Sequence, residues 1–318
     1  MLDKYLSYTK HWFKLGTKMD KVNVLMCTYK EEISIVKQAV ESIIQQTYQN
    51  IELIVVIDNP DRMDLVDLFE NYRSFFSMKY VVNETNMGLP KSLNIGLALC
   101  DAAFVARMDA DDIALPDRIE NQMDFLLKNH CDLVGGYIQL IDENGSILCN
   151  RTNYPIHDKA IRRMLLFKDC VPHPTWFFRR EIAIKLNGYR EIFAAEDYDF
   201  LIRAMFVGAK FGILPKICLQ YRVNRSGITQ NNLGLQKVLT EKIADQYRNN
   251  TVYKTSEFVD YIVKNQKALQ KKDYFYSCVK KREKNISDLC RILFSFTLLE
   301  EIRERVAEKV VLVYDRYM

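Results

Sequence analysis

The stretch with the clearest chemical potential holds three closely spaced carboxylates, Asp109, Asp111 and Asp112. They follow the apolar run 102–106, which is typical of a buried strand, and Pro116 lies shortly after them. In an open α/β sheet, ligands bind at the carboxyl ends of the strands. Neighbouring carboxylates repel one another unless they share a cation, so the pattern fits a divalent metal that holds a phosphorylated substrate. It fits equally well a solvated turn whose aspartate caps the following helix.

A second acidic pair, Glu196 and Asp197, opens a segment with helical spacing. Acidic residues favour the first turn of a helix because the N-terminal backbone N–H groups stabilise negative charge, and this alone explains the pair. A carboxylate at that position could also act as a general base. His173, between Pro172 and Pro174, has two similar interpretations, a packed structural residue or a side chain that positions an acceptor.

The elements that must position these residues alternate between strands and helices. Short apolar runs predict buried strands, and the segments between them have helical spacing. The expected strands are 22–27, 51–57, 79–82 and 104–108, separated by helices at 33–46, 64–76 and 89–100. Strands that are apolar on both faces and alternate with helices predict a parallel sheet of the nucleotide-binding α/β type.

The second half of the chain is less regular. Its pattern predicts helices at 116–129, 156–167, 181–186 and 196–207, and strands at 131–141, 173–178, 211–214 and 217–222. From residue 233 onward it predicts only helices and irregular segments. We therefore expect an N-terminal extension at 1–20, an α/β domain at 21–231 and a helical C-terminal region at 232–318.

Composition describes an ordinary globular protein. The chain has 318 residues, of which 48% are hydrophobic and 27% charged, enough for a sizeable core. The net charge of +4 demands no nucleic-acid partner, and residues 237–318 carry 17 basic and 12 acidic side chains, so the basic surplus lies in the tail. The chain contains neither GxGxxG nor GxxxxGK[ST], which argues against dinucleotide-binding and P-loop enzymes.

Cysteine usage and hydropathy indicate the compartment. Eight cysteines are scattered without a CxxC pair, which favours a reduced, cytoplasmic protein over a disulfide framework or a zinc site. No apolar run approaches the roughly 18 residues that span a bilayer, and the N-terminus lacks the apolar core of a signal peptide. We expect a protein that is soluble, or peripheral at the inner face of the cell membrane.

Six motifs occur in an order and at spacings that resemble the family 2 glycosyltransferases with the GT-A fold. The motifs are CTYKEE, IELIVVID, NMGLPKSLNIG, RMDADD, HPTWFFRR and AEDYDFLIR. The resemblance covers about residues 20–230. It implies the GT-A nucleotide-diphospho-sugar transferase fold, with a mostly parallel central sheet flanked by helices and a helical C-terminal extension. It also implies inverting transfer from a nucleotide sugar, usually a UDP-sugar, in bacterial capsule, O-antigen or exopolysaccharide synthesis.

The resemblance assigns roles on the donor side. Thr28 and Tyr29 match the loop that lines the nucleoside, and Asp58 matches the acid that hydrogen-bonds the base. Asp109 and Asp111 match the DxD motif. In that motif the first acid usually serves the nucleotide side, and the last coordinates the Mn²⁺ or Mg²⁺ ion that sits on the diphosphate.

Further roles concern the reaction itself. Lys91 stands where a basic residue can approach the diphosphate, and Asp197, in the Glu196–Asp197 pair, matches the general base. Asp112 is an added acid that lies near the metal, faces the acceptor or caps a helix. Asn224 stands where many relatives carry histidine, and a neutral amide is a poorer partner for metal or phosphate.

The basic tail has two interpretations. A charged run at 280–284 lies near an apolar stripe, and this combination suits docking on an anionic membrane that carries a polyprenyl-diphosphate-linked saccharide acceptor. A helical subdomain that packs on the core or forms a dimer explains the stripe as well. The stripe consists of Leu289, Ile292, Leu293, Phe296 and Leu299.

Two other functions compete with glycosyl transfer. A sugar nucleotidyltransferase needs a glycine-rich loop with Lys or Arg after the first strand, whereas residues 28–32 read Thr-Tyr-Lys-Glu-Glu. A non-catalytic carbohydrate-binding relative has no need of intact acids at both sites. Glycosyl transfer to a glycan or a lipid-linked saccharide is therefore the favoured hypothesis.

Overall fold

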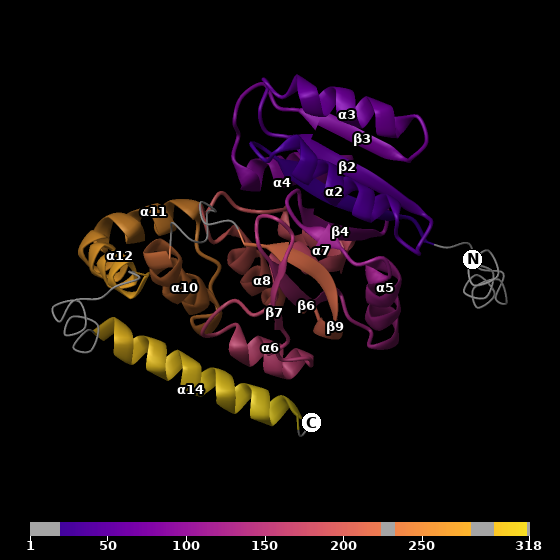
Figure 1. Cartoon of the computed structure of the whole chain (residues 1–318). Helices are drawn as coiled ribbons and strands as arrows, with labels where there is room; N and C mark the ends of the chain where they lie inside the picture. Colours follow the sequence, from indigo (N-terminus) through magenta and orange to yellow (C-terminus); the bar gives the residue numbers. More distant parts are fainter. Residues whose placement is uncertain (1–19, 224–232, 281–295, 317–318) are drawn as a thin grey trace.

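The computed structural model describes residues 20–223, 233–280 and 296–316. The described part forms a curled sheet covered by helices, with the C-terminal helices gathered against one side (Figure 1). Most of the expected N-terminal extension, Asn224 and the basic residues 281–284 lie outside the described residues. The expected domain boundaries stay a prediction.

One nine-stranded sheet runs through the molecule in the order β3-β2-β1-β4-β8-β6-β9-β5, with β7 paired to β6. The strands are β1 (Val22–Thr28), β2 (Ile51–Ile57), β3 (Met78–Val82), β4 (Phe104–Asp109), β5 (Ile113–Ala114), β6 (Leu133–Ile141), β7 (Ile147–Arg151), β8 (Phe177–Arg179) and β9 (Phe211–Arg222). Strands β3, β2, β1 and β4 are mutually parallel, as expected. In the second half β6 and β9 are parallel, whereas β5, β7 and β8 pair antiparallel to their neighbours.

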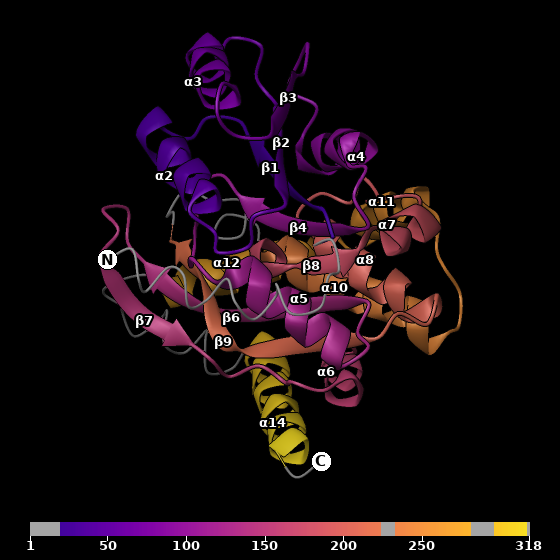
Figure 2. The same cartoon turned by 90° about the vertical axis from the view of Figure 1, so that its right-hand side faces the viewer.

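Helices cover both faces of this sheet. They are α2 (Ile33–Ile44), α3 (Met63–Arg73), α4 (Leu89–Leu99), α5 (Arg118–Lys128), α6 (Asp158–Met164), the 3₁₀ helix η1 (His173–Thr175), α7 (Arg180–Leu186), α8 (Glu196–Phe206), α10 (Leu233–Arg248), α11 (Thr255–Lys264), α12 (Gln266–Lys280) and α14 (Phe296–Arg316). Seen from the side, α14 projects from the end of the molecule opposite β2 and β3 (Figure 2). The helical C-terminal region expected from the sequence is thus present where it is described.

Strands β1 and β2 are buried along almost their whole length because apolar side chains point to both faces of the sheet. Leu25 belongs to one apolar cluster, and its neighbours Val24 and Met26 belong to the cluster on the opposite face. Helix α4 approaches β1 closely at Gly96, where an added Cβ would lie 2.2 Å from the Leu25 Cδ1 atom. This close packing fixes the loops at the carboxyl ends of the parallel strands.

The structure corrects several expected elements. The two strands expected around Pro215 form a single strand, β9, and the pairing with β6 shifts register near Tyr137 to accommodate the interruption. The strand expected at 173–178 begins as η1, and only Phe177–Arg179 pairs as β8. The prolines at 172 and 174 explain this, since neither offers a backbone N–H to a ladder. The helix expected at 156–167 is shorter and covers Asp158–Met164.

Candidate active site

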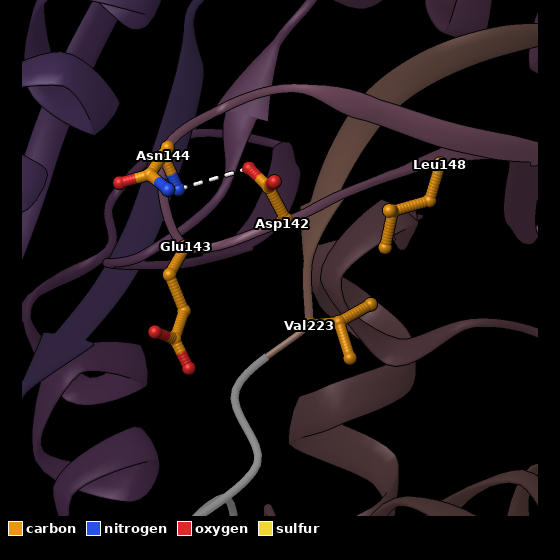
Figure 3. A pocket seen from close by; sticks show the side chains of 5 residues that line it. All are labelled: Asp142, Glu143, Asn144, Leu148 and Val223. Carbon is orange, nitrogen blue, oxygen red and sulfur yellow. Dashed lines mark hydrogen bonds between the residues drawn. The ribbon is translucent and has the colours of Figure 1, made fainter.

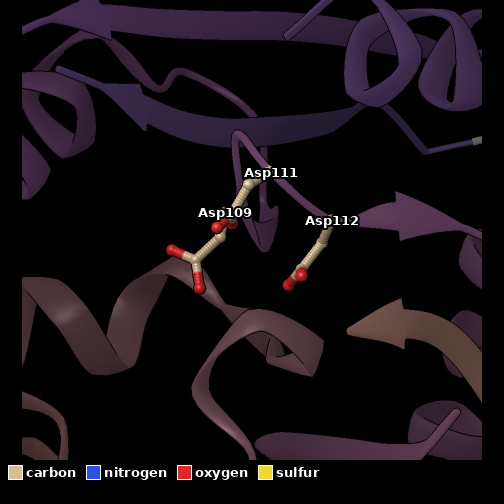
Figure 4. A group of neighbouring side chains, drawn as sticks. All are labelled: Asp109, Asp111 and Asp112. Carbon is tan, nitrogen blue, oxygen red and sulfur yellow. The ribbon is translucent and has the colours of Figure 1, made fainter. Parts of the chain in front are cut away.

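The three acids after β4 form one cluster. One oxygen from each of Asp109, Asp111 and Asp112 lies within 4.8 Å of the others (Figure 4). Asp109 is the last residue of β4, whose neighbour β1 ends at the same edge of the sheet. The predicted metal pair, Asp109 and Asp111, is therefore brought together, and Asp112 joins it. Carboxylate oxygens at this spacing suit a hard cation such as Mn²⁺ or Mg²⁺.

The electrostatics of the cluster also fit a cation. Burial, followed by the charges of Asp109 and Glu31, raises the pKa of Asp111 to about 7. Burial and the charges of Asp111 and Asp109 raise the pKa of Asp112 well above its ordinary value. The Asp112 Oδ2 atom is buried and has no hydrogen-bond partner among the described residues. A bound divalent ion would offset both the repulsion and the lost hydration.

Asp112 is fixed by the last residues of β9. Its Oδ1 atom accepts a hydrogen bond from the Arg222 backbone N–H at 2.9 Å, and its side chain is 1% exposed. The helix-cap interpretation of Asp112 is wrong, because α5 begins at Arg118 after Asp117. Arg222, which sequence reasoning did not single out, also donates from Nε to the Asp111 carbonyl at 2.9 Å. An acceptor-side role for Asp112 stays a prediction.

Metal binding is expected to weaken as pH falls below about 7. Because the pKa of Asp111 is raised to about 7, this carboxyl is protonated below that pH and must lose a proton to coordinate a cation. The apparent Mn²⁺ affinity should then fall by up to about tenfold per pH unit. Titration of free Mn²⁺ by electron paramagnetic resonance between pH 5.5 and 8 measures this, with Asp111→Asn as the variant in which the dependence becomes weaker. A wild-type affinity that does not vary with pH would rule out Asp111 as a titrating ligand.

A buried arginine lies beside these acids and was missed as a functional residue. The Arg107 Nη2 atom is 2.5 Å from the Asp109 Oδ1 atom, and the side chain is 2% exposed. Its Nε and Nη1 atoms have no hydrogen-bond partner among the described residues. The signal in the sequence was a charged residue within the apolar strand that leads to the acids. Arg107 therefore offers positive charge and free donors under the acid cluster.

The second acidic pair faces the same site. Glu196 is 8% exposed, and burial together with the charge of Asp197 raises its pKa to about 8. Burial raises the pKa of Asp197 as well, whereas the Tyr198 N–H, which donates to Asp197 Oδ1 at 2.7 Å, and the charge of Arg107 lower it. Arg107 and Asp109 influence the pKa of both acids of the pair. The charged residues at the start of α8 and at the end of β4 are therefore close enough to influence one another's pKa values.

Helix α8 is anchored one turn after this pair. Asp199 is 0% exposed and forms ion pairs with Arg203 Nε at 2.8 Å and with Arg190. Asp199 and Arg203 are four residues apart on one face of α8, and Arg190 extends this pair, because Arg190 Nη2 also donates to Gln246 of α10 at 2.9 Å. The C-terminal region therefore helps to hold the helix that presents Asp197.

Replacing Asp199 with alanine should lower the free energy of unfolding by about 3–5 kcal/mol. The change leaves Arg190 and Arg203 without their shared carboxylate in a site that water scarcely reaches. Asp64→Ala is the matched control, since Asp64 pairs with Arg62 where its side chain is 44% exposed, and it should cost about 1 kcal/mol or less. Urea denaturation of both variants measures the difference, and equal losses would contradict the assignment.

His173 lies in an aromatic cluster rather than in open space. Its side chain is 7% exposed, its Nε2 atom is 2.9 Å from the Tyr189 hydroxyl oxygen, and its ring is 4.5 Å from that of Trp176. Burial and the charge of Arg107 lower the pKa of His173 well below its ordinary value, so the ring is neutral. These contacts favour the packed structural interpretation, and the acceptor-side role stays a prediction.

Glu31 holds the loop after β1 through hydrogen bonds, a role that the sequence did not indicate. The Glu31 Oε2 atom accepts from the Thr28 hydroxyl at 2.8 Å and from the Tyr29 N–H at 2.7 Å. Thr28 is buried, whereas Tyr29 is 41% exposed. The phenol ring is therefore available to a ligand, and the nucleoside-lining roles of Thr28 and Tyr29 stay predictions.

Asp58 organises the neighbouring loop. Its Oδ1 atom accepts from Asn83 Nδ2 and from the Met87 N–H, each at 2.7 Å, and its Oδ2 atom accepts from the Gly88 N–H at 2.8 Å. Gly88 has φ 81°, a conformation that favours glycine, and directly precedes α4. Base recognition by Asp58 stays a prediction. The Oδ2 atom is better placed for it than Oδ1, because Oδ2 accepts one hydrogen bond within the protein and Oδ1 accepts two. The Nζ atom of Lys91, in the first turn of α4, lies 3.3 Å from Glu191 Oε2 in a half-exposed ion pair.

A cavity of about 460 Å³ lies next to the acid cluster but is not lined by it (Figure 3). It opens where the β6–β7 turn meets the residue after β9. Its lining residues are Asp142, Glu143, Asn144, Leu148 and Val223. The Arg222 guanidinium connects the two places, because it donates to the carbonyls of Asp142 and Glu143 as well as to that of Asp111. This cavity lies beside the predicted site and contains none of its residues.

Comparison with known proteins agrees with this geometry. Residues 23–186 match the family described as Glycosyl transferase family 2. The chain is 28% identical over 236 residues to the O-antigen biosynthesis glycosyltransferase WbnJ of Escherichia coli, covering 74% of this chain and 92% of that protein. It is 25% identical to the E. coli UDP-Gal:alpha-D-GlcNAc-diphosphoundecaprenol beta-1,3-galactosyltransferase, covering 71% and 82%.

A solved structure shares the architecture. S. aureus TarS 1–349 in complex with UDP-GlcNAc superposes with a TM-score of 0.60 and 17% identity, covering 86% of this chain and 78% of that one. At this identity the likeness concerns the fold, and it confirms the GT-A fold expected from the sequence motifs.

Proposed function

The chain belongs to glycosyl transferase family 2 and is a glycosyltransferase, and we propose that it transfers a sugar from a UDP-sugar with inversion in surface polysaccharide synthesis. The main observation behind this proposal is that two groups of acidic residues, from β4 and from α8, lie near the same buried arginine, Arg107. Asp109 at the end of β4 contacts Arg107, and Glu196 and Asp197 at the start of α8 are within its electrostatic reach. Single displacement needs one acid group for the donor diphosphate and another for the acceptor hydroxyl.

On the donor side, Asp109 and Asp111 would hold the metal, and Asp112 would support them through the end of β9. A divalent ion bound there neutralises the charge that builds on the departing UDP. Arg107 keeps its Nε and Nη1 donors free under this cluster, so it adds positive charge that is already in place before the donor binds. Lys91, which pairs with Glu191 in a half-exposed contact, would supply a second positive charge.

On the acceptor side, the Asp197 carboxylate takes the proton of the attacking hydroxyl. The hydroxyl oxygen forms the new bond to the anomeric carbon as the bond to UDP breaks, so the configuration inverts. Burial raises the pKa of Asp197, which makes this carboxylate a stronger base, and the charge of Arg107 opposes that rise. Glu196, whose pKa is about 8, is protonated at neutral pH and leaves the negative charge on Asp197.

The relatives support the finer identity of the substrates. TarS forms a complex with UDP-GlcNAc, and one E. coli relative is named for UDP-Gal, so a UDP-sugar donor is proposed here. The same relative is named for a GlcNAc-diphosphoundecaprenol acceptor, which supports a polyprenyl-diphosphate-linked saccharide at the inner membrane face. Among the described residues, no helix combines the length and hydropathy needed to cross a bilayer.

A binding screen tests the donor assignment. Thermal shift with UDP-glucose, UDP-galactose, UDP-GlcNAc and UDP-GalNAc, each with Mn²⁺ or with EDTA, should show stabilisation by at least one donor that depends on the metal. ADP-glucose and GDP-mannose are the matched controls for the base. Equal stabilisation by all nucleotide sugars, or equal stabilisation in EDTA, would contradict the proposal. Pyrophosphate release from UTP and a sugar phosphate would instead favour a nucleotidyltransferase.

A further inference from the structure

Helix α14 divides its charged residues between two faces. All five of its acids contact the body of the protein, four through ion pairs with lysines and Asp315 through hydrogen bonds with Ile156 and His157, so they lie on the side that faces inward. The contacts are Glu300–Lys272 at 3.0 Å, Glu301–Lys237 at 3.2 Å, Glu304–Lys237, Glu308–Lys168 at 2.6 Å and Asp315–His157 at 2.9 Å. Val311, on the same inward side, is buried. The helix is thus bound to the body by its negative face.

The opposite face of α14 is apolar and exposed. Ile302, Val306, Val310 and Val313 recur at intervals of four, four and three residues, which places them on one stripe of the helix. Their exposed fractions are 48%, 57%, 63% and 54%. Four large aliphatic side chains that are each about half exposed on a single helix stripe indicate a surface that meets a partner.

Two basic residues accompany this stripe. Lys309 lies within it by helical spacing and Arg305 borders it, and both are exposed. Neither has an ion pair among the described residues, whereas the basic partners of the inward acids come from other elements. The outward face of α14 therefore combines an apolar stripe with two exposed basic residues that form no ion pair in the described part of the chain, although Arg305 lies near Glu301.

We infer that this face, formed by Ile302, Arg305, Val306, Lys309, Val310 and Val313 and here termed the α14 outer face, docks on an anionic lipid surface. An amphipathic helix of 21 residues is about 31 Å long and can lie in the plane of a bilayer. Its aliphatic side chains would enter the boundary between headgroups and acyl chains, and its cations would meet anionic headgroups. Helix α14 lies at an end of the described structure (Figures 1 and 2), and the residues of its outer face are exposed there.

Charge complementarity decides between a lipid surface and a second copy of the chain. In a two-fold symmetric dimer the same patch meets itself, so Arg305 and Lys309 would face the positive charges of the partner. The acids of α14 pair with residues of the body, and of the two cations only Arg305 lies near one of them, Glu301, so Lys309 would have no acid of this helix to offset it. An anionic membrane supplies the missing negative charge. This surface is independent of the donor site, and its failure would leave the proposed glycosyl transfer intact.

Vesicle co-sedimentation of the full chain tests the inference. Vesicles of phosphatidylcholine with one-third phosphatidylglycerol should bind the protein at low salt, and vesicles of phosphatidylcholine alone should bind it far less. Arg305→Glu with Lys309→Glu should weaken binding by at least about 25-fold, since each basic residue near such a surface contributes about fivefold. Val306→Ser with Val310→Ser should weaken it by removing the apolar contact.

Matched controls separate this surface from general charge and hydrophobicity. Lys128→Glu with Lys185→Glu produces the same change in net charge on α5 and α7, and Val259→Ser with Val263→Ser alters an equally exposed pair on α11. Both control variants should bind as the wild type does. Equal binding by the α14 variants, or no binding of the wild type to anionic vesicles, would overturn the inference. A concentration-dependent dimer that Val306→Ser with Val310→Ser dissociates would assign the face to a second copy.

Discussion

Replacing Asp197 with asparagine is expected to lower the rate of sugar transfer by about 10²–10⁴-fold, the contribution typical of a positioned general base. The asparagine side chain has the same size as that of aspartate, and its carbonyl oxygen can still accept the hydrogen bond from the Tyr198 N–H at the start of α8. It cannot, however, take the proton of the acceptor hydroxyl. Because Asp197 lies on the helix rather than in the DxD cluster, metal-dependent UDP binding should change little.

Measurement of kcat and of the UDP dissociation constant on the same preparation checks both parts of this expectation. Asp124→Asn is the control, since Asp124 is a partly exposed acid on α5 that pairs only with Lys128 among the described residues. Its kinetics should match those of the wild type. An Asp197→Asn enzyme with full activity would place the general base elsewhere, and Glu196→Gln would be the next variant to examine.

Replacing Asp111 with asparagine should have a different signature. We expect transfer to fall by about 10³-fold or more, because a missing metal ligand removes several kcal/mol of charge stabilisation from the departing UDP. Binding of UDP should weaken as well and should no longer respond to Mn²⁺. The variant should also be more stable than the wild type in EDTA at pH 8, since it removes a carboxylate whose pKa burial and Asp109 raise to about 7.

The sign of that stability difference follows from the pKa shift. A carboxyl whose pKa is raised on folding binds protons more tightly in the folded state, so its ionisation destabilises the fold as pH rises from about 4 towards 7. The advantage of Asp111→Asn should therefore be absent at pH 4 and largest above pH 7. Thermal denaturation in EDTA across this range measures it, and an advantage that does not depend on pH would contradict the buried-cluster account.

The first half of the fold followed from the sequence because its signals are local. Strands such as Ile51–Ile57 are apolar on both faces, alternate with helical segments and end on polar residues. Parallel pairing then places the ends of β1, β2 and β4 at one edge, which is where the acids were expected. The DxD pair could be predicted for the same reason, since its position depends on one strand and the turn after it.

The rest depends on contacts between distant residues. Strand β5 has two residues and β7 is exposed along its length, so neither carries an apolar signal, and both exist only because β9 and β6 pair with them. Arg107 appeared in the sequence only as a polar residue between apolar ones. Its role depends on α8, which lies about 90 residues later in the chain and brings Glu196 and Asp197 to the same site.

Two further expectations depended on environment. His173 looked equally able to serve an acceptor or to pack, and its neutral ring between Tyr189 and Trp176 could not be inferred without the fold. The basic run at 280–284 suggested membrane contact from the sequence, but all of it after residue 280 lies outside the described residues. The described surface with that character is instead the outer face of α14, where sequence alone cannot tell which stripe of the helix is covered.

The most direct test of the central claim measures two quantities during the hydrolysis of a UDP-sugar. These are the release of UDP and, by proton NMR, the anomeric configuration of the freed sugar. The wild type should hydrolyse at least one UDP-sugar slowly in the presence of Mn²⁺, stop when EDTA is added, and release the sugar first in the inverted configuration. Asp111→Asn and Asp197→Asn should both lose this activity, and Asp124→Asn should keep it. Retained configuration, or release that continues unchanged in EDTA, would contradict an inverting and metal-dependent transfer at this site.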